Sequence, residues 1–154
     1  MNFALTSSAF PNEGEIPMQF TCDGEDLSPP LSFTDVPEGA RSLALIVDDP
    51  DAPDPAAPRM TWVHWVLYNL PADASGLAES VTDLPAGTLQ GINDWKRTGY
   101  GGPCPPIGTH RYFFKLYALD TTLELEAGAT KQELLDAMAG HVLAEGELIG
   151  VYER

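Results

Sequence analysis

The chain has 154 residues, the size of one ordinary domain that buries a core without disulfides or structural metal. Its 23 acidic residues outnumber its 8 basic ones and give a formal net charge of −15, so its long-range field repels nucleic acid and anionic membrane surfaces. We therefore expect a single domain over residues 1–154 that does not bind nucleic acid. The acidic surface is interpreted as a solubility feature.

The N-terminal stretch MNFALTSSAFPNEGEIP has no basic region and no sustained apolar run, and it contains Pro11, so it does not resemble a secretory signal. No apolar run reaches the roughly 18 residues that a membrane-spanning helix needs. We expect a cytoplasmic protein without membrane insertion. Cys22 and Cys104 lie far apart without CxxC spacing, which indicates neither zinc nor a redox motif. Two free thiols are predicted, although Cys22 could lie near Cys104 at one end of the fold.

Short β-type runs separated by glycines and prolines predict an antiparallel sandwich or barrel. Three weaker strand candidates come first: FALTS from Phe3, MQFTC from Met18, and SPPLSF from Ser28, whose prolines favour an edge position. Four clear strands follow: SLALIVDD from Ser42, TWVHWVLYNL from Thr61, RYFFKLYALD from Arg111 and ELIGVYE from Glu147. The predicted core includes Leu43, Leu45, Val47, Val66, Phe114, Leu116 and Ile149.

One helix is predicted near Lys131–Glu145. Thr130 and Glu133 have the spacing of a capping box, and apolar residues follow at helical intervals. Gly146 is expected to end the helix. His141 would lie near its C-terminus, where a cation suits the helix dipole, so we interpret it as structural.

Two loops supply the residues that can do chemistry. The first, rich in Asp and Pro, precedes a strand whose period of two places Trp62, His64, Val66 and Tyr68 on one face. Asp49 or Asp51 of this loop could fix the tautomer of His64.

The second loop, GYGGPCPPIGTHRY, is rich in glycine and proline and leads into His110 and Tyr112. Gly101, Gly102 and Gly108 allow a ligand to approach the backbone closely, and their N–H groups could bind an anion. Two stiff loops that each deliver a histidine to a strand predict a shared pocket.

The stretches DPDAP, WVHW and GGPCPPIGTHRY resemble the signature blocks of the phosphatidylethanolamine-binding protein family. The likeness covers nearly the whole chain and is closest to the short bacterial and archaeal Raf kinase inhibitor-like branch, through FTCDGEDLSPPLSF, NDWKRTGYGGPCPP and FFKLYALD. It implies an all-β fold, an antiparallel Greek-key β-sandwich with a few small peripheral helices. It also implies a pocket for phosphate or a phosphorylated head group, a cis peptide at Ala52–Pro53 and a possible homodimer. We expect no cofactor. The pocket residues that the resemblance implies are Asp49, His64, Pro106, His110 and Tyr112.

Each of these residue types suggests a role. His64 and His110 could each donate an N–H to phosphate and take up a proton as the anion binds. Tyr112 offers a phenolic donor, and Asp49 could orient an imidazole or accept from a protonated phosphate oxygen. The chain has a shorter IGTHRY turn than the larger eukaryotic members and lacks their long C-terminal helix, so Raf inhibition is not expected.

The leading prediction is a non-enzymatic module that binds a small anion. Three alternatives use other chemistry. Cys104 with His110 or His64 as base and Asp49 as orienter would form a thiol-dependent hydrolase. Asp49, Asp51, His64 and His110 could hold a metal ion. The third alternative is a protein-interaction module.

Overall fold

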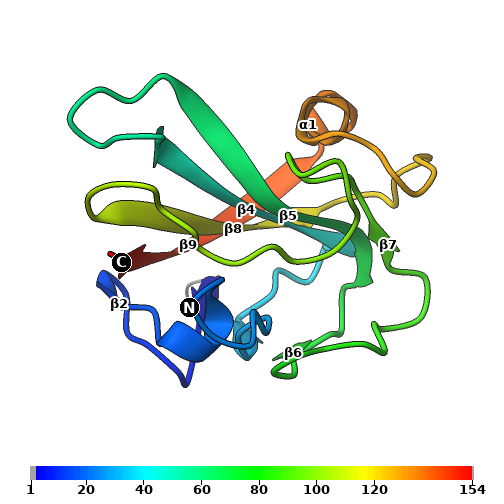
Figure 1. Ribbon diagram of the computed structural model, residues 1–154. Coiled ribbons are helices and arrows are strands. Elements are labelled where there is room, and N and C mark those ends of the chain that lie inside the picture. The colour runs from blue at the N-terminus through cyan, green and yellow to red at the C-terminus, as the bar shows by residue number, and fades with distance from the viewer. Residues whose placement is uncertain (1–2, 154) are drawn as a thin grey trace.

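The molecule is a sandwich of two β-sheets (Figure 1). The computed structural model describes residues 3–153. The smaller sheet has the order β1–β3–β6, formed by Ala4–Thr6, Leu31–Thr34 and Gly76–Leu77. The larger sheet has the order β2–β9–β8–β4–β5–β7, formed by Gly14–Glu15, Val142–Tyr152, His110–Leu119, Ser42–Ala52, Met60–Pro71 and Leu89–Gln90. The predicted class, a mainly-β sandwich with small peripheral helices, is confirmed.

Four long strands form the centre of the larger sheet and correspond to the four clear strands predicted from sequence. β4 and β5 form an antiparallel hairpin, and β8 pairs antiparallel with β9, which follows it in the chain after α1 (Lys131–Met138). The two strand pairs form one sheet because β4 also pairs antiparallel with β8. The short strand β2 pairs parallel with β9 at the edge.

Both faces of the larger sheet are covered. One cluster of buried side chains, which we call the inner core, lies between the two sheets and includes Leu43, Leu45 and Val47. A second cluster, the outer core, includes Ala44 and Ile46 and lies on the opposite face. Figure 1 shows α1 and the N-terminal segment on opposite sides of this sheet. A strand buried on both faces has no polar side to alternate with, which explains the continuous apolar run of β4.

Six of the seven predicted core residues are buried. The exception is Ile149, which is only half-buried, whereas its neighbour Leu148 is 2% exposed. In β9 the buried positions are Gly146, Leu148, Gly150 and Tyr152. The inward-facing residues are therefore shifted by one position from the predicted Ile149.

Helix α1 spans Lys131–Met138, about half the predicted length. The capping box is present: Glu133 N–H donates to Thr130 Oγ1 at 3.1 Å, and Thr130 N–H donates to Glu133 Oε1 at 2.9 Å. Gly140 then takes a positive φ of 82°, and β9 begins at Val142, so the prediction of helix to Glu145 is wrong. Within residues 3–153, no helix is long and apolar enough to span a membrane.

One weaker strand prediction is also wrong, and so is the edge position expected for another. Met18–Phe20 forms the 3₁₀ helix η1 instead of a strand. The SPPLSF segment is not an edge strand, because β3 lies between β1 and β6. Pro29 and Pro30 precede β3 and therefore take no part in its ladder.

A candidate ligand-binding pocket

A β-bulge in β5 sets the position of His64. Val47 of β4 pairs with Trp65, but the next β4 residue, Asp48, pairs with Val63. His64 is therefore the extra residue on β5, and a bulge of this kind bends a strand and redirects its side chains.

The bulge breaks the predicted alternation of β5. Val66 and Tyr68, expected on the same face as His64, pack in the outer core. The ring of His64 instead lies 5.2 Å from that of Tyr112, which belongs to the inner core. The face prediction is wrong beyond His64 because it assumed a regular strand.

The end of the β4–β5 hairpin forms one wall of the pocket. Asp49 pairs with Trp62 and Ala52 pairs with Met60, with a register shift between these pairs. The peptide bond between Ala52 and Pro53 is cis, as the family resemblance implied. The proline-acid stretch is thus partly strand, and only residues 53–59 connect β4 to β5.

All five predicted site residues line one pocket of about 320 Å³. Its wall contains no Lys or Arg among the described residues, and most of it is apolar or aromatic. The full lining is Asp49, Ala52, Pro53, Met60, Trp62, His64, Trp95, Cys104, Pro105, Pro106, His110 and Tyr112.

Asp49 and His110 form a closely paired unit in this wall. His110 Nδ1 lies 2.5 Å from Asp49 Oδ2, and His110 Nε2 donates to the carbonyl oxygen of Ile107 at 2.9 Å. Because a carbonyl only accepts, Nε2 carries a proton, and one further proton lies between Nδ1 and the carboxyl group. The pair therefore has no net charge, whichever group holds that proton. Burial raises the pKa of Asp49, while the hydrogen bond from His110 opposes this rise.

His64 presents an acceptor to the pocket. Its Nδ1 donates to the carbonyl oxygen of Gly101 at 2.7 Å, which leaves Nε2 as the ring atom available to a ligand. Burial lowers the pKa of His64 to about 4, so the ring is neutral near pH 7 and Nε2 carries a lone pair. The ring of Trp95 meets that of His64 edge-on at 5.0 Å.

Tyr112, which also lines the pocket, carries a buried donor. Its side chain is 1% exposed, and its hydroxyl has no hydrogen-bond partner among the described residues. Burial, and to a lesser degree the charge of Asp49, raises the pKa of this phenol, so it stays protonated. A buried hydroxyl without a partner is costly, and a ligand group that reaches it would remove that cost.

Asp51 has a structural partner outside the pocket lining. Nε and Nη2 of Arg111 donate to its two carboxylate oxygens, each at 2.9 Å. These bonds from Arg111 lower the pKa of Asp51. Between residues 3 and 153, no group of three His, Cys, Asp or Glu side chains is arranged to hold a metal ion, so the alternative of a metal site has no geometric support.

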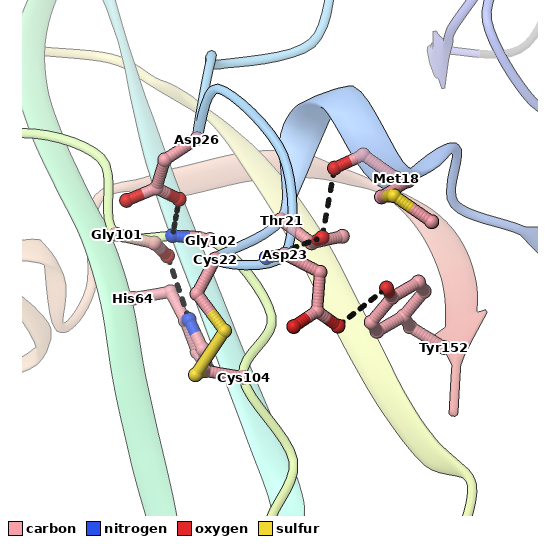
Figure 2. The surroundings of a disulfide bond; sticks show 10 residues. All are labelled: Met18, Thr21, Cys22, Asp23, Asp26, His64, Gly101, Gly102, Cys104 and Tyr152. Atoms are coloured by element: carbon pink, nitrogen blue, oxygen red, sulfur yellow. Dashed lines mark hydrogen bonds between the residues drawn. A yellow bond between two sulfur atoms is a disulfide. The ribbon is translucent and has the colours of Figure 1, made fainter. Parts of the chain in front are cut away.

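Cys22 and Cys104 form a disulfide (Figure 2), so the prediction of two free thiols is wrong. The backbone brings them together, because Cys22 N–H donates to the carbonyl oxygen of Pro103 at 3.1 Å. In this state Cys104 has no thiol to act as the nucleophile of a hydrolase.

Sequence reasoning missed one wall of the pocket. Trp95 comes from the connection between β7 and β8 and meets Trp62 edge-on, with ring centroids 5.6 Å apart. The stretch NDWKRTGY that contains it was recognised only as part of the family resemblance. An isolated tryptophan in a loop of polar residues carries no periodic signal that would place it in a pocket.

Comparison with known proteins identifies the family. The model of the phosphatidylethanolamine-binding protein family matches residues 6–153. The chain belongs to the phosphatidylethanolamine-binding protein family. It is 57% identical over 153 residues to a UPF0098 protein of Methanothermobacter thermautotrophicus, covering 97% of this chain and 98% of the relative.

Solved structures of the phosphatidylethanolamine-binding protein family agree with this fold. A putative homologue from Chlamydia trachomatis has a TM-score of 0.92 at 47% identity, and the match covers 99% of this chain and 98% of that one. YbcL of E. coli, described as a member of the same family, has a TM-score of 0.90 at 32% identity, covering 100% and 99%. These similarities establish the fold over nearly the whole chain. Members of this family are generally ligand-binding proteins.

Proposed function

We propose that this protein is a non-enzymatic binding protein for a small phosphorylated ligand, which it takes up as a singly charged, protonated anion. The observation that carries the proposal is the pairing of Tyr112 and His64 in one pocket wall. One offers a phenolic donor without a partner, and the other offers an imidazole acceptor. The two rings lie 5.2 Å apart, close enough for one small group to contact both.

A protonated phosphate monoester matches this pair of groups. Its P–OH donates to His64 Nε2, and an unprotonated oxygen accepts from Tyr112. Sulfate and phosphodiesters offer only acceptors and cannot satisfy His64 while that ring is neutral. A doubly charged phosphate would enter a wall without Lys or Arg in a protein of net charge −15. The family is named after phosphatidylethanolamine, a phospholipid with a phosphorylated head group, and this name also supports the ligand class.

The two pocket histidines no longer have the same expected role of donating to phosphate. His110 uses both ring nitrogens within the protein, so it positions Asp49 and Ile107 and leaves direct contact to His64 and Tyr112. Pro105 and Pro106 line the pocket but have no backbone N–H, so fewer main-chain donors are available than the glycine-rich sequence indicated.

The rest of the wall suits an apolar substituent on the phosphate. Trp62, Trp95 and Met60 line the pocket, and Met60 is 48% exposed. Phenyl phosphate combines a monoester with a small aromatic ring and is a suitable probe.

Calorimetric titration of phenyl phosphate at about pH 5.5 tests the proposal. Tyr112→Phe keeps the ring and removes the donor, so the affinity should fall roughly 2- to 10-fold, the range for one neutral hydrogen bond. Tyr117→Phe is the matched control, because Tyr117 lies on the same strand outside the pocket lining. The proposal is overturned if wild type does not bind phenyl phosphate or if Tyr112→Phe binds it as tightly as wild type.

The hydrolase alternative is less well supported, because its nucleophile is held in the disulfide. An activity screen of the reduced protein against aryl phosphates and aryl esters would test it. Turnover that is lost in Cys104→Ser would replace our proposal with that alternative.

A further inference from the structure

The Cys22–Cys104 disulfide is both exposed and part of the pocket wall. Cys104 lines the pocket, and both cysteines are exposed, whereas His64, His110 and Tyr112 are buried. Disulfides break when a thiolate attacks one of the sulfurs, so exposure decides which can react. This disulfide is therefore accessible to a reductant from solvent.

The disulfide reinforces a contact between two segments that do not pair in a sheet. We call residues 99–107 the pocket loop and residues 18–26 the clamp segment. Gly102 N–H donates to Asp26 Oδ1 at 2.8 Å, and the hydroxyl of Tyr100 donates to the carbonyl oxygen of Phe20 at 2.8 Å (Figure 2 shows the first of these bonds). A Cβ on Gly102 would lie 2.4 Å from the carbonyl oxygen of Phe20, so the two backbones are in close contact.

The disulfide is the one covalent link between these segments, and it joins residues 82 positions apart. The clamp segment has only the three-residue helix η1 as regular structure. A crosslink that closes a long loop strongly restricts the freedom of the segments it joins. Its loss leaves a few hydrogen bonds to hold the pocket loop.

The pocket loop also holds His64. Gly101 N–H donates to the carbonyl oxygen of His64 at 3.0 Å. The carbonyl oxygen of Gly101 accepts from His64 Nδ1 at 2.7 Å (Figure 2). The second bond keeps the proton on Nδ1 and thereby keeps Nε2 an acceptor. If the loop moves away, the ring can take the other tautomer, in which Nε2 carries a proton and no longer accepts from a ligand.

We propose that the Cys22–Cys104 disulfide is a thiol-responsive modification site that controls ligand binding in the pocket, an inference that rests on the proposed function. The oxidised form holds the pocket loop against the clamp segment and binds the phosphorylated ligand tightly. The reduced form releases the loop and binds it more weakly. The reactant is a dithiol, either a small molecule or the active site of a dithiol reductase.

The exchange is balanced in two steps. One thiolate of the dithiol attacks a sulfur of one of the exposed cysteines, the bond between the two cysteines breaks, and a mixed disulfide forms with one protein thiolate released. The second thiolate of the dithiol then attacks the mixed disulfide and releases the other cysteine. The dithiol loses two electrons and two protons and becomes an intramolecular disulfide. The two protein thiolates take up two protons, so the protein gains two thiols.

The test compares three samples by titration of phenyl phosphate: oxidised wild type, wild type reduced with dithiothreitol and desalted without oxygen, and Cys22→Ser. Cys22 does not line the pocket, so this variant breaks the bond and leaves the wall unchanged in composition. We expect the dissociation constant to rise roughly 3- to 10-fold on reduction, as when a loop holds its binding geometry for a third to a tenth of the time. Cys22→Ser should match the reduced protein, with no further response to dithiothreitol.

Alkylation and mass spectrometry verify the state of each sample, with no modified cysteine in oxidised protein and two in reduced protein. Hydrogen exchange at the Gly101 amide gives a second readout that needs no ligand, and it should quicken on reduction. If oxidised wild type binds and all three samples bind equally, redox control is wrong and the proposed function stands. If no sample binds, the proposed function is wrong, and equal exchange at Gly101 in both redox states would also overturn the role of the disulfide.

Discussion

Asp49 and His110 form a buried pair, with 2.5 Å between Oδ2 and Nδ1. The other oxygen of Asp49 accepts from Asp51 N–H at 2.7 Å, and the other nitrogen of His110 donates to Ile107. The carboxyl group in this wall thus has protein partners for both oxygens. The acid is therefore compatible with the proposed anionic ligand, because the pair adds no net negative charge.

Binding of phenyl phosphate should depend on the proton of the ligand. Free His64 stays neutral above about pH 4, so it adds no titration between pH 5 and 8. The bond between Nε2 and phosphate needs one proton, which the monoester carries below its second pKa of about 6. Affinity should be flat from about pH 5 to 6 and then fall up to tenfold per pH unit. Calorimetry at several pH values measures this.

Sulfate is the control ligand for that experiment because it keeps its double charge over the whole range. It should bind more weakly than phenyl phosphate at about pH 5.5. Affinity for phenyl phosphate that increases above pH 6 would contradict the protonated-ligand model.

The stability of the fold should decrease in acid because of His64. Its pKa is 6.5 when unfolded and about 4 when folded, since burial penalises the charged ring. Below pH 6.5 the unfolded chain binds the extra proton and the folded protein does not, so the free energy of unfolding falls as pH falls. The contribution lost by pH 4 is about 3 kcal/mol.

Denaturant unfolding of wild type and His64→Gln between pH 4 and 7 measures this contribution. The variant should show a shallower dependence on pH. His141→Gln is the matched control, because His141 is exposed and contacts Asp120 at 2.8 Å. Parallel pH profiles for wild type and His64→Gln would refute the assignment.

Gly101 should tolerate no side chain. A Cβ there would lie 2.2 Å from the ring of Trp95, which is below any real contact distance. Gly101→Ala should lower the free energy of unfolding by about 1–3 kcal/mol, typical of overpacking, and should weaken binding of phenyl phosphate through His64. At Gly39 the nearest atom to a Cβ would be 3.6 Å away, so Gly39→Ala serves as the control. Thermal unfolding that ranks the two variants equally would contradict this account.

The resemblance to the short bacterial branch predicts a homodimer, and light scattering over a micromolar dilution series should report twice the mass of the 154-residue chain. A monomer mass throughout would exclude it. Cytoplasmic location likewise stays a prediction, which fractionation of cells can check.

Local patterns were sufficient where one sequence signal determines one structural outcome. The apolar run from Leu43 to Val47 predicted a buried strand because both of its faces are covered. Thr130 and Glu133 predicted the helix start because the capping box is local. The family motifs predicted five residues that line one pocket, a set that periodicity alone would not have grouped.

The features that were missed depend on contacts between distant segments. Apolar spacing continued past Met138 as if in a helix, but pairing of Val142 with Leu119 commits that stretch to β9. The bulge at His64 depends on the register with β4. Cys22 and Cys104 are brought together by a backbone hydrogen bond between Cys22 and Pro103, and no local sequence pattern predicts this contact.

The uncharged pocket wall has a consequence for salt. A site that binds anions through Lys or Arg loses affinity as ionic strength rises, because counterions screen the attraction. Here the long-range field of a −15 protein repels the approaching anion, while the close contacts are hydrogen bonds between neutral groups and the ligand. Screening therefore weakens only the repulsion. Capture of a phosphorylated ligand should be faster in concentrated salt than in dilute buffer.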